Sequence, residues 1–446
     1  MTEQKIVELT PFRASLVRSL ACRGERLLAA EDLAEEVADL EPLEAYYAVR
    51  EIGLEQALPI LLELSPEQLE ACVDLDCWNR YDFAADSLDE WLTAFAQDGP
   101  ESLARAFSSL DYVVQLLFLT QAVTVYDPDT DLVPEDDDEN DPNRAMTPDG
   151  FYLLELKNEV ALRTHPFTLL DTLYQYDSAA AHRLLSDIRV DLQTQIEEEA
   201  LRFRNGRMQD LGFVAPDEAS VLFSRPSDQQ PLPRATEPLE VAPSRLPSVY
   251  AGALGETTLL EQALSRVTDP EELSRLEQEI VWTINGAVIA YGEKMQDLKV
   301  VTDIAERVRD TISLGLEVLL AQAEPDSPPE GAAAAAKAVE LLTVWCMIDL
   351  FRHGFAATLG LQQEVRQAMT DPGFSAWYNL TQMSQADDPA DRQARAFVSA
   401  LHGRHPLQGG FDPALIEKVK AFASLAEIAV AKARWQRLLA GISIGE

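Results

Sequence analysis

Residues 197–223 read EEEALRFRNGRMQDLGFVAPDEASVLF, and this stretch decides how the chain is organised. Its first part consists of helix-forming residues, whereas Gly212 suits the left-handed position that follows a helix end. Pro216 then blocks any continuation of that helix. We therefore expect a long helix that ends just before Gly212, with Phe213 folded back on Met208.

The same stretch carries three arginines, which stand out in an acidic chain. Glu198 and Glu199 precede Arg202 by four and three residues, and Arg207 precedes Asp210 by three, spacings that place opposite charges side by side on a helix. A guanidinium group also suits a bidentate oxyanion. Candidate residues for binding a ligand or partner are therefore Arg202, Arg204, Arg207 and Asp210. The alternative is that the arginines neutralise acidic helices of the same molecule, and the excess of acid favours it.

The net charge of the chain limits the kinds of partner that it can bind. The 446 residues include 76 acidic and 36 basic ones, which gives a formal net charge of -40. Nucleic acids and anionic membranes are bound by displacing counterions with Lys and Arg, so neither is an expected partner. A chain of this length is expected to form two or three domains.

The cysteines and the N-terminus indicate the compartment. Cys22, Cys72, Cys77 and Cys346 form no Cys-x-x-Cys pair, so we expect reduced thiols, mostly in the core. The first residues lack a basic region leading into an apolar one, which argues against a signal peptide. The longest nearly uncharged run, 113–126, is too short to cross a bilayer. These features predict a soluble, cytoplasmic protein.

Capped amphipathic helices follow one another through residues 1–126. Ser65 precedes a proline and a capping-box glutamine, and Ser87 begins a second capping-box pattern. The repeated order of leucine-rich turn, break and capped helix predicts an all-α array of helical hairpins, similar to a solenoid. Trp78 and Trp91 are expected to be core residues at helix junctions rather than an aromatic pocket.

An acidic loop is expected at residues 127–150. Five of its carboxylates match positions 1, 3, 5, 9 and 12 of a calcium-binding loop, namely Asp127, Asp129, Asp131, Glu135 and Asp138. Leu132 occupies the place of the turn glycine, and two prolines stiffen the segment. A solvated loop with weak attraction for divalent cations is therefore favoured over a specific calcium site.

The remaining domain boundaries follow from composition. Residues 151–223 are expected to continue the helices, although Phe151 to Leu156 fits either a strand or a helix start. Six prolines among polar residues predict a linker over 224–248. Residues 249–446 predict a helical bundle, with helices at Glu271–Gly292, Asp297–Ala323, Ala332–Met369, Ala390–Leu401 and Ala414–Leu439. Asn285 is expected to make a buried hydrogen bond between helices or to the backbone.

Sequence motifs for chemistry are scarce. His402 and His405 have a spacing that metal ligands also show. They lie at a predicted helix end, however, where a histidine interacts favourably with the helix dipole without any ligand. The chain lacks a glycine-rich phosphate loop, a Gly-x-Ser-x-Gly elbow and a His-Glu-x-x-His motif. No cofactor is expected, and a catalytic site assembled only in space would escape this search.

The stretch from Glu198 to Ala219 is similar to the signature of a bacterial family known as domain of unknown function 6178. The Leu75–Trp78 turn with Trp91, the run Thr311–Glu317 and the segment Leu350–Gly354 resemble other parts of that family. The resemblance spans nearly the whole chain and implies a bacterial, largely helical protein. Because the family has no established activity, no catalytic or binding residue is carried over.

These observations predict an all-α, cytoplasmic protein without enzymatic activity, which binds another protein or regulates it through a groove or acidic face. One alternative is a module that binds a divalent cation or a small anionic ligand. A second alternative is an enzyme whose site is dispersed in sequence.

Overall fold

The computed structural model describes residues 10–132, 141–157, 161–226, 246–255, 257–293, 295–379, 389–409 and 419–443. The chain divides into two compact units. Unit 2 runs from Ala21 to Phe213, and unit 1 combines the residues up to Leu20 with those from Val214 onward. The first helix thus belongs with the C-terminal residues, an assignment that the sequence analysis did not make. Most of the expected linker, 227–245, lies outside the described residues.

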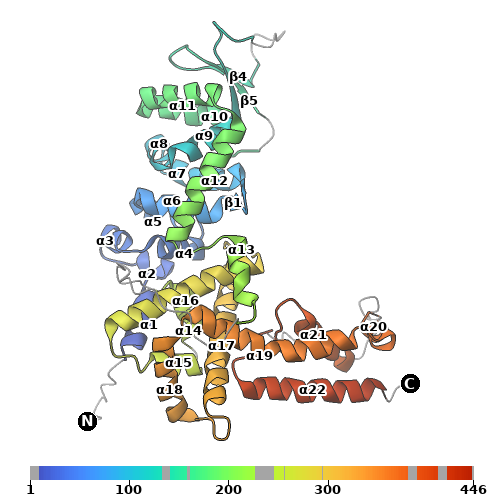
Figure 1. Ribbon diagram of the computed structural model, residues 1–446. Coiled ribbons are helices and arrows are strands. Elements are labelled where there is room, and N and C mark those ends of the chain that lie inside the picture. Colours follow the sequence, from blue (N-terminus) through green and yellow to red (C-terminus); the bar gives the residue numbers. More distant parts are fainter. Residues whose placement is uncertain are drawn as a thin grey trace, which may run out of the picture. The chain divides into compact units, whose positions relative to one another are not determined.

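Unit 2 is built mainly from short helices, most of them between four and thirteen residues long (Figure 1). Helix α12 is the longest helix of this unit. The helices of this unit are α2 Gly24–Leu27, α3 Leu33–Ala38, α4 Pro42–Ile52, α5 Leu58–Glu63, α6 Pro66–Asp76, α7 Ala85–Ala96, α8 Pro100–Ser109, α9 Tyr112–Ala122, α10 Pro166–Tyr176, α11 Ser178–Val190 and α12 Gln193–Asp210.

Local capping explains one predicted helix start and corrects another. Ser65 caps α6 with the full capping box, since its hydroxyl accepts from Gln68 N and the Gln68 side chain accepts from Ser65 N. The second box is wrong, because α7 begins at Ala85, before Ser87. Asp89 instead accepts hydrogen bonds from the backbone of Arg163 and Thr164 far along the chain.

Two small antiparallel sheets interrupt the helices of unit 2. A hairpin pairs β1 Trp78–Asn79 with β2 Asp82–Phe83. The second sheet has the order β3-β5-β4, with β3 Val123–Tyr126, β4 Arg144–Met146 and β5 Leu153–Leu156. Of the segment Phe151 to Leu156, which the sequence left open, residues 153–156 form a strand, and β4 lies within the segment that was expected to be an acidic loop.

Helix packing around tryptophan forms part of the core of unit 2. Trp91 is 1% exposed, and its indole N–H donates to Asp76 at 2.7 Å. Trp78 is 8% exposed and packs edge-on against Phe83. The prediction that both are core residues is confirmed. Cys22, Cys72 and Cys77 are buried, and all four cysteines are free thiols.

The end of α12 has the predicted geometry. Gly212 has φ +79°, and the backbone N–H of Phe213 donates to the Met208 carbonyl at 2.8 Å. Gly206 lies within the helix, and a methyl group there would meet nothing within 4 Å. Its presence therefore does not reflect a close backbone contact.

Unit 1 contains the longest helices of the molecule. Its helices are α1 Pro11–Ala21, whose last residue is assigned to unit 2, then α13 Pro216–Ala219, the 3₁₀ turn η1 Ser220–Phe223, α14 Ser248–Leu254, α15 Leu259–Leu264, α16 Pro270–Tyr291, α17 Leu298–Ala323, α18 Gly331–Val344, α19 Met347–Ala368, α20 Pro372–Asn379, α21 Pro389–His402 and α22 Leu425–Ser443. The predicted hydrogen bond of Asn285 is confirmed, because it accepts from the Tyr250 hydroxyl at 2.6 Å between α14 and α16.

Two predicted helices of unit 1 are wrong at their boundaries. The expected helix Ala332–Met369 breaks at Trp345 and Cys346, because Glu279 from α16 accepts from Met347 N at 3.0 Å and caps a new start. The helix expected over Ala414–Leu439 corresponds to α22, Leu425–Ser443; residues 414–418 lie outside the described residues, and 419–424 are not helical.

Glycines bring α17 and α19 into direct backbone contact. A methyl group on Gly315 would lie 1.9 Å from the Leu350 carbonyl oxygen, and one on Gly354 would lie 2.0 Å from the Thr311 carbonyl oxygen. Only hydrogen fits at either place. Two of the segments that carry the family resemblance thus meet at this crossing.

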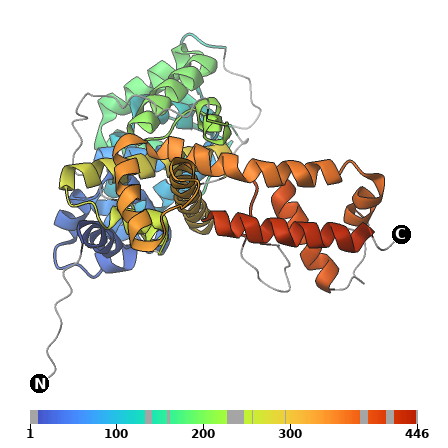
Figure 2. The same ribbon diagram turned by 60° about the horizontal axis from the view of Figure 1, so that its bottom comes forward.

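The C-terminal helices of unit 1 share a separate apolar cluster. Helices α19 and α22 run side by side, with α20 and α21 against them (Figure 2). Phe374, Phe397 and Trp435 come from three different helices of this cluster and are almost fully buried. Each burial of an aromatic side chain contributes about 2 kcal/mol, so this cluster holds the helix pair together.

Helices carry the cores of both units, so the all-α class is confirmed, while the solenoid-like arrangement stays a prediction. Within the described part of the chain, no helix combines the length and apolar character needed to cross a membrane.

Candidate functional site

The arginines of α12 face acidic residues of their own unit. Arg207 donates to both carboxylate oxygens of Asp74, at 2.6 and 3.0 Å, and to Asp111 at 2.8 Å. Glu70 lies 3.2 Å away. Burial raises the pKa of Asp74, and the hydrogen bonds and charge of Arg207 act in the opposite direction. The expected pairing of Arg207 with Asp210 is wrong, because the Arg207 guanidinium instead binds Asp74 of α6 and Asp111, the N-cap of α9.

Arg204 is held by backbone oxygens and an aromatic ring. Its Nε donates to the Asp74 carbonyl at 3.0 Å, and its guanidinium lies 5.2 Å from the centre of the Trp78 ring. Arg202 is exposed and pairs with Glu199 at 3.5 Å, as predicted. Asp210 is exposed and makes no ion pair with the described residues. These contacts support internal neutralisation rather than an open anion site.

The acidic loop already holds a positive charge. Arg189 of α11 donates to Asp131 at 2.7 and 3.0 Å and lies 3.8 Å from Asp127. Its hydrogen bonds lower the pKa of Asp131 to about 2. Asp129 is exposed, while Glu135 and Asp138 lie outside the described residues. Within the described ranges, no group of three metal-ligating side chains could hold an ion.

The two histidines singled out in the sequence, His402 and His405, belong to no group of three metal-ligating side chains among the described residues. His405 stacks on Phe223 with ring centres 3.6 Å apart and also contacts Tyr291. Burial lowers the pKa of His405 to about 4, so it is neutral at physiological pH. Its role is that of an aromatic packing residue.

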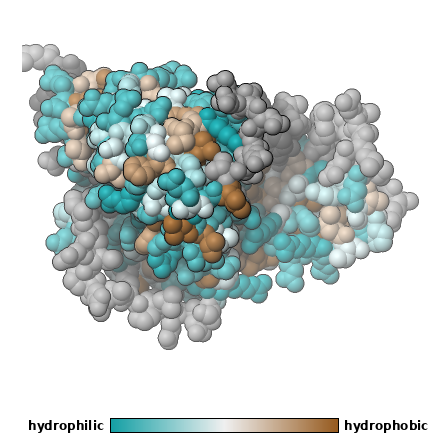
Figure 3. Space-filling model, turned by 90° about the horizontal axis from the view of Figure 1, so that it is seen from above, coloured by the Kyte–Doolittle hydropathy of each residue, from teal (hydrophilic) through white to brown (hydrophobic). Residues whose placement is uncertain are grey.

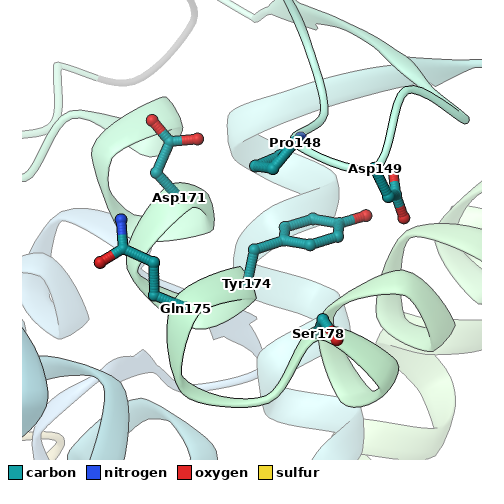
Figure 4. Close-up of a pocket in the computed structure, with 6 residues that line it drawn as sticks. All are labelled: Pro148, Asp149, Asp171, Tyr174, Gln175 and Ser178. Carbon is teal, nitrogen blue, oxygen red and sulfur yellow. The ribbon is translucent and has the colours of Figure 1, made fainter.

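An open pocket lies in unit 2 between the β4–β5 turn and the junction of α10 with α11 (Figure 4). Its volume is about 290 Å³. Asp171, Tyr174 and Gln175 share one side of α10, because they are spaced three and four residues apart. The lining residues are Pro148, Asp149, Asp171, Tyr174, Gln175 and Ser178.

A tight turn fixes Asp149 on one wall of this pocket. Its carboxylate accepts from the Thr147 hydroxyl at 2.6 Å and from Phe151 N at 3.2 Å. The other oxygen lies 3.0 Å from Nδ1 of His182 on α11. Burial acts to raise the pKa of Asp149, but these hydrogen bonds outweigh it and the pKa lies below its ordinary value. Asp149 is therefore ionised at neutral pH.

Tyr174 forms the apolar part of the pocket and is 7% exposed. Its buried hydroxyl points toward Asp149 (Figure 4), and a hydrogen bond between the two groups contributes to the lowered pKa of Asp149. Burial and then the charge on Asp149 raise the pKa of Tyr174. The hydroxyl therefore stays protonated.

The pocket does not have the geometry of a nucleophilic catalytic site. A His–Asp pair beside a serine is the arrangement such sites use. In the described chain, however, His182 makes its hydrogen bond to Asp149 and none to Ser178. The His182 ring instead packs between Phe151 and Tyr152, with ring centres 5.2 and 5.1 Å away.

Sequence reasoning missed this pocket. Thr147 to Gly150 was assigned only to the end of the expected acidic loop, and His182 lies 33 residues beyond Asp149. The spacing of Asp171, Tyr174 and Gln175 on a predicted helix was the available signal. This spacing does not reveal that the turn at Asp149 would pack against the same side of the helix.

The fold and these sites define an all-α protein whose polar clusters are largely satisfied internally. A family model for a family of unknown function, DUF6178, matches residues 11–441. The chain therefore belongs to that family. No curated protein and no solved structure matches it.

Proposed function

We propose that this protein is a cytoplasmic interaction or regulatory scaffold without enzymatic activity, which binds a partner protein through one face of unit 2. This turn face consists of Met146, Phe151 and Tyr176 together with the pocket carboxylates Asp149 and Asp171.

The observation that carries the proposal is the exposure of large apolar side chains around the pocket. Phe151 is 62% exposed, Met146 50% and Tyr176 49%. Met146 and Phe151 flank the turn that bears Asp149, and Tyr176 follows the pocket residue Gln175. Methionine and aromatic residues are enriched in protein interfaces. Seen from the β4 and β5 end, apolar groups interrupt a largely hydrophilic surface (Figure 3).

The rigidity of the turn face also supports docking. Thr147 N donates to the Tyr152 carbonyl at 2.9 Å, and β4 is paired along its length with β5. A preformed surface loses less conformational entropy on binding than a disordered one. With a net charge of -40, the complementary partner surface is a basic one.

The alternatives have less support. The guanidinium groups of Arg204 and Arg207 are bonded within unit 2, which leaves them unsuited to a small anion. Arg189 occupies the described part of the acidic loop, where a divalent cation would have to bind. The dispersed-enzyme alternative lacks a contact between His182 and a nucleophile among the described residues.

Affinity capture from native cells tests the proposal. The full-length protein should retain one or two stoichiometric proteins, and the triple variant Met146→Ser, Phe151→Ser, Tyr176→Ser should lose them. The matched control is Val430→Ser on α22, which removes a side chain that is 67% exposed elsewhere. Recovery of no partner, or equal recovery by the triple variant at an unchanged melting temperature, would overturn the proposal.

A further inference from the structure

We infer that helix α1 is a releasable strap of unit 1, which detaches from α15 and α16 while the rest of the unit stays folded, and that ionisation of Glu277 on α16 promotes its release. The inference is independent of the proposed function, because it concerns contacts within unit 1 and needs no partner protein.

The buried side of α1 is small and half polar. Its buried residues are Phe12, Ser15, Leu16 and Ser19, which the helical spacing places on one side. Ser19 is 1% exposed, and its hydroxyl has no hydrogen-bond partner among the described residues, a condition that costs stability. The buried residues of α17, by contrast, are mainly apolar. We therefore expect α1 to open before the centre of unit 1 does.

Two arginines of α1 act on carboxylates of unit 1. Arg13 donates through two nitrogens to one oxygen of Glu261 on α15, at 3.3 and 3.1 Å. Its side chain is 56% exposed, so solvent screens this pair and the pair holds the helix weakly. Glu277 on α16 accepts a hydrogen bond from Ser15, and the charge of Arg18 acts on it. The state of Glu277 is therefore coupled to the docking of α1.

The environment of Glu277 favours a neutral carboxyl while α1 is docked. Other charged residues of α15 and α16 form ion pairs of their own, namely Arg275 with Glu272 and Glu279, and Glu261 with Arg13. Glu277 is 4% exposed, and burial outweighs the contributions of Ser15 and Arg18 and raises its pKa to about 7. Release of α1 admits water to this group and returns its pKa toward the ordinary value of 4.5.

The direction of the pH effect follows from these two states. The docking free energy that the raised pKa supplies is fully present below about pH 4.5 and is lost as the pH rises through 7. Between pH 6 and pH 8, the ratio of released to docked α1 should increase about tenfold. The docked state has to give up a proton in this interval, whereas the released state has already lost it.

Release of α1 changes how the two units are connected. The chain passes between them after Leu20 and again after Phe213. With α1 docked, both passages lead into the folded part of unit 1. With α1 released, the passage after Phe213 is the one that remains attached to it, so pH controls the number of anchored connections.

Hydrogen exchange of the full-length protein tests the inference, with mass spectrometric detection and correction for the intrinsic pH dependence of amide exchange. In the wild type, the protection of the amides of α1 should fall about tenfold between pH 6 and pH 8, while those of α17 stay protected at both values. Glu277→Gln cannot ionise, so the protection of α1 in this variant should be the same at both pH values.

Two further variants separate sensing from docking. Glu317→Gln removes a half-buried carboxyl of α17 whose pKa burial also raises, and it should retain the tenfold change in α1. Arg13→Gln should lower the protection of α1 about twofold to fivefold at both pH values alike. Constant protection of α1 in the wild type, an equal fall in Glu277→Gln, or identical protection of α1 and α17 would overturn the inference.

Discussion

The α17–α19 crossing of unit 1 and the α6–α12 contact of unit 2 hold helices together in opposite ways. At the first, glycines remove the side chains and the two backbones touch. At the second, Arg207 fills the space between helices and neutralises carboxylates on α6 and α9. Both regions carry segments of the family resemblance. Segments that carry the family resemblance can therefore specify helix packing alone. In unit 1 they do so with glycines that allow two backbones to touch, and in unit 2 with an arginine that pairs with carboxylates.

The largest expected effect comes from filling the glycine contact. Gly354→Ala places a methyl group 2.0 Å from the Thr311 carbonyl oxygen, and a backbone atom cannot rotate away. We expect a loss of more than about 3 kcal/mol in the free energy of unfolding, measured by urea denaturation.

The matched control lies on the same helix. At Gly360 a methyl group would meet nothing within 4 Å, so Gly360→Ala should be neutral or stabilise by up to about 1 kcal/mol. Equal effects of the two substitutions would break the comparison, because space would then not be what distinguishes this crossing.

Removing the charge in unit 2 should cost somewhat less. Arg207→Met leaves the fully buried Asp74 carboxylate without its fork, and we expect a loss of about 3 kcal/mol in urea denaturation. Adding Asp74→Asn should recover part of that loss. Arg202→Met, which removes an arginine that is 73% exposed, should change stability by less than about 0.5 kcal/mol. A neutral Arg207→Met would show that packing alone holds α12.

A buried acid of unit 1 provides a contrasting case, because Ser15 acts on it through a hydrogen bond and Arg18 through its charge. Glu277 of α16 is 4% exposed, and burial raises its pKa to about 7 from an ordinary value of 4.5. The folded state therefore binds this proton more tightly than the unfolded chain. The stability it contributes is present below about pH 4.5 and is lost as pH rises through 7.

The measurement compares urea denaturation of the wild type and Glu277→Gln at pH 6 and pH 8. We expect the wild type to lose about 1 kcal/mol more than the variant between these two values. Parallel losses would show that Glu277 does not titrate in this interval.

The smallest effect concerns Gly206, which has neither the close contact of Gly354 nor a charge. Gly206→Ala should stabilise the fold by about 0.5–1 kcal/mol, because alanine lowers the conformational entropy of the unfolded chain. The added methyl group meets nothing within 4 Å in the folded helix, so it causes no clash. Gly212→Ala should destabilise by about 1 kcal/mol, because φ is +79° there. Thermal denaturation of both variants checks the sign of each effect.

Local signals predicted the helices better than the contacts between them. The helix predicted at Asp297–Ala323 is α17, Leu298–Ala323, with Asp297 as its N-cap, and the end of α12 was specified by Gly212 and Phe213. The break before Met347 could not be predicted, because the group that caps it, Glu279, comes from another helix. For the helix at 425–443, a Ser-x-x-Glu pattern beginning at Ser424 marks the start and was overlooked.

The candidate site escaped prediction for the same reason. The arginines were found because they are adjacent in sequence, yet nothing local shows that Asp74 and Asp111 would occupy them. The pocket joins a turn to two later helices, and its Asp149–His182 contact spans 33 residues. Contacts of this kind depend on the tertiary fold, and no periodic pattern in the sequence marks them.

Arg189 gives the acidic loop a tethered competitor. Because this guanidinium is anchored on α11 beside Asp127 and Asp131, it is present at an effective concentration that a free ion reaches only in the millimolar range. A divalent cation must displace it before it can reach those oxygens. Neutralising Arg189 would therefore leave Asp127 and Asp131 open to any cation in solution.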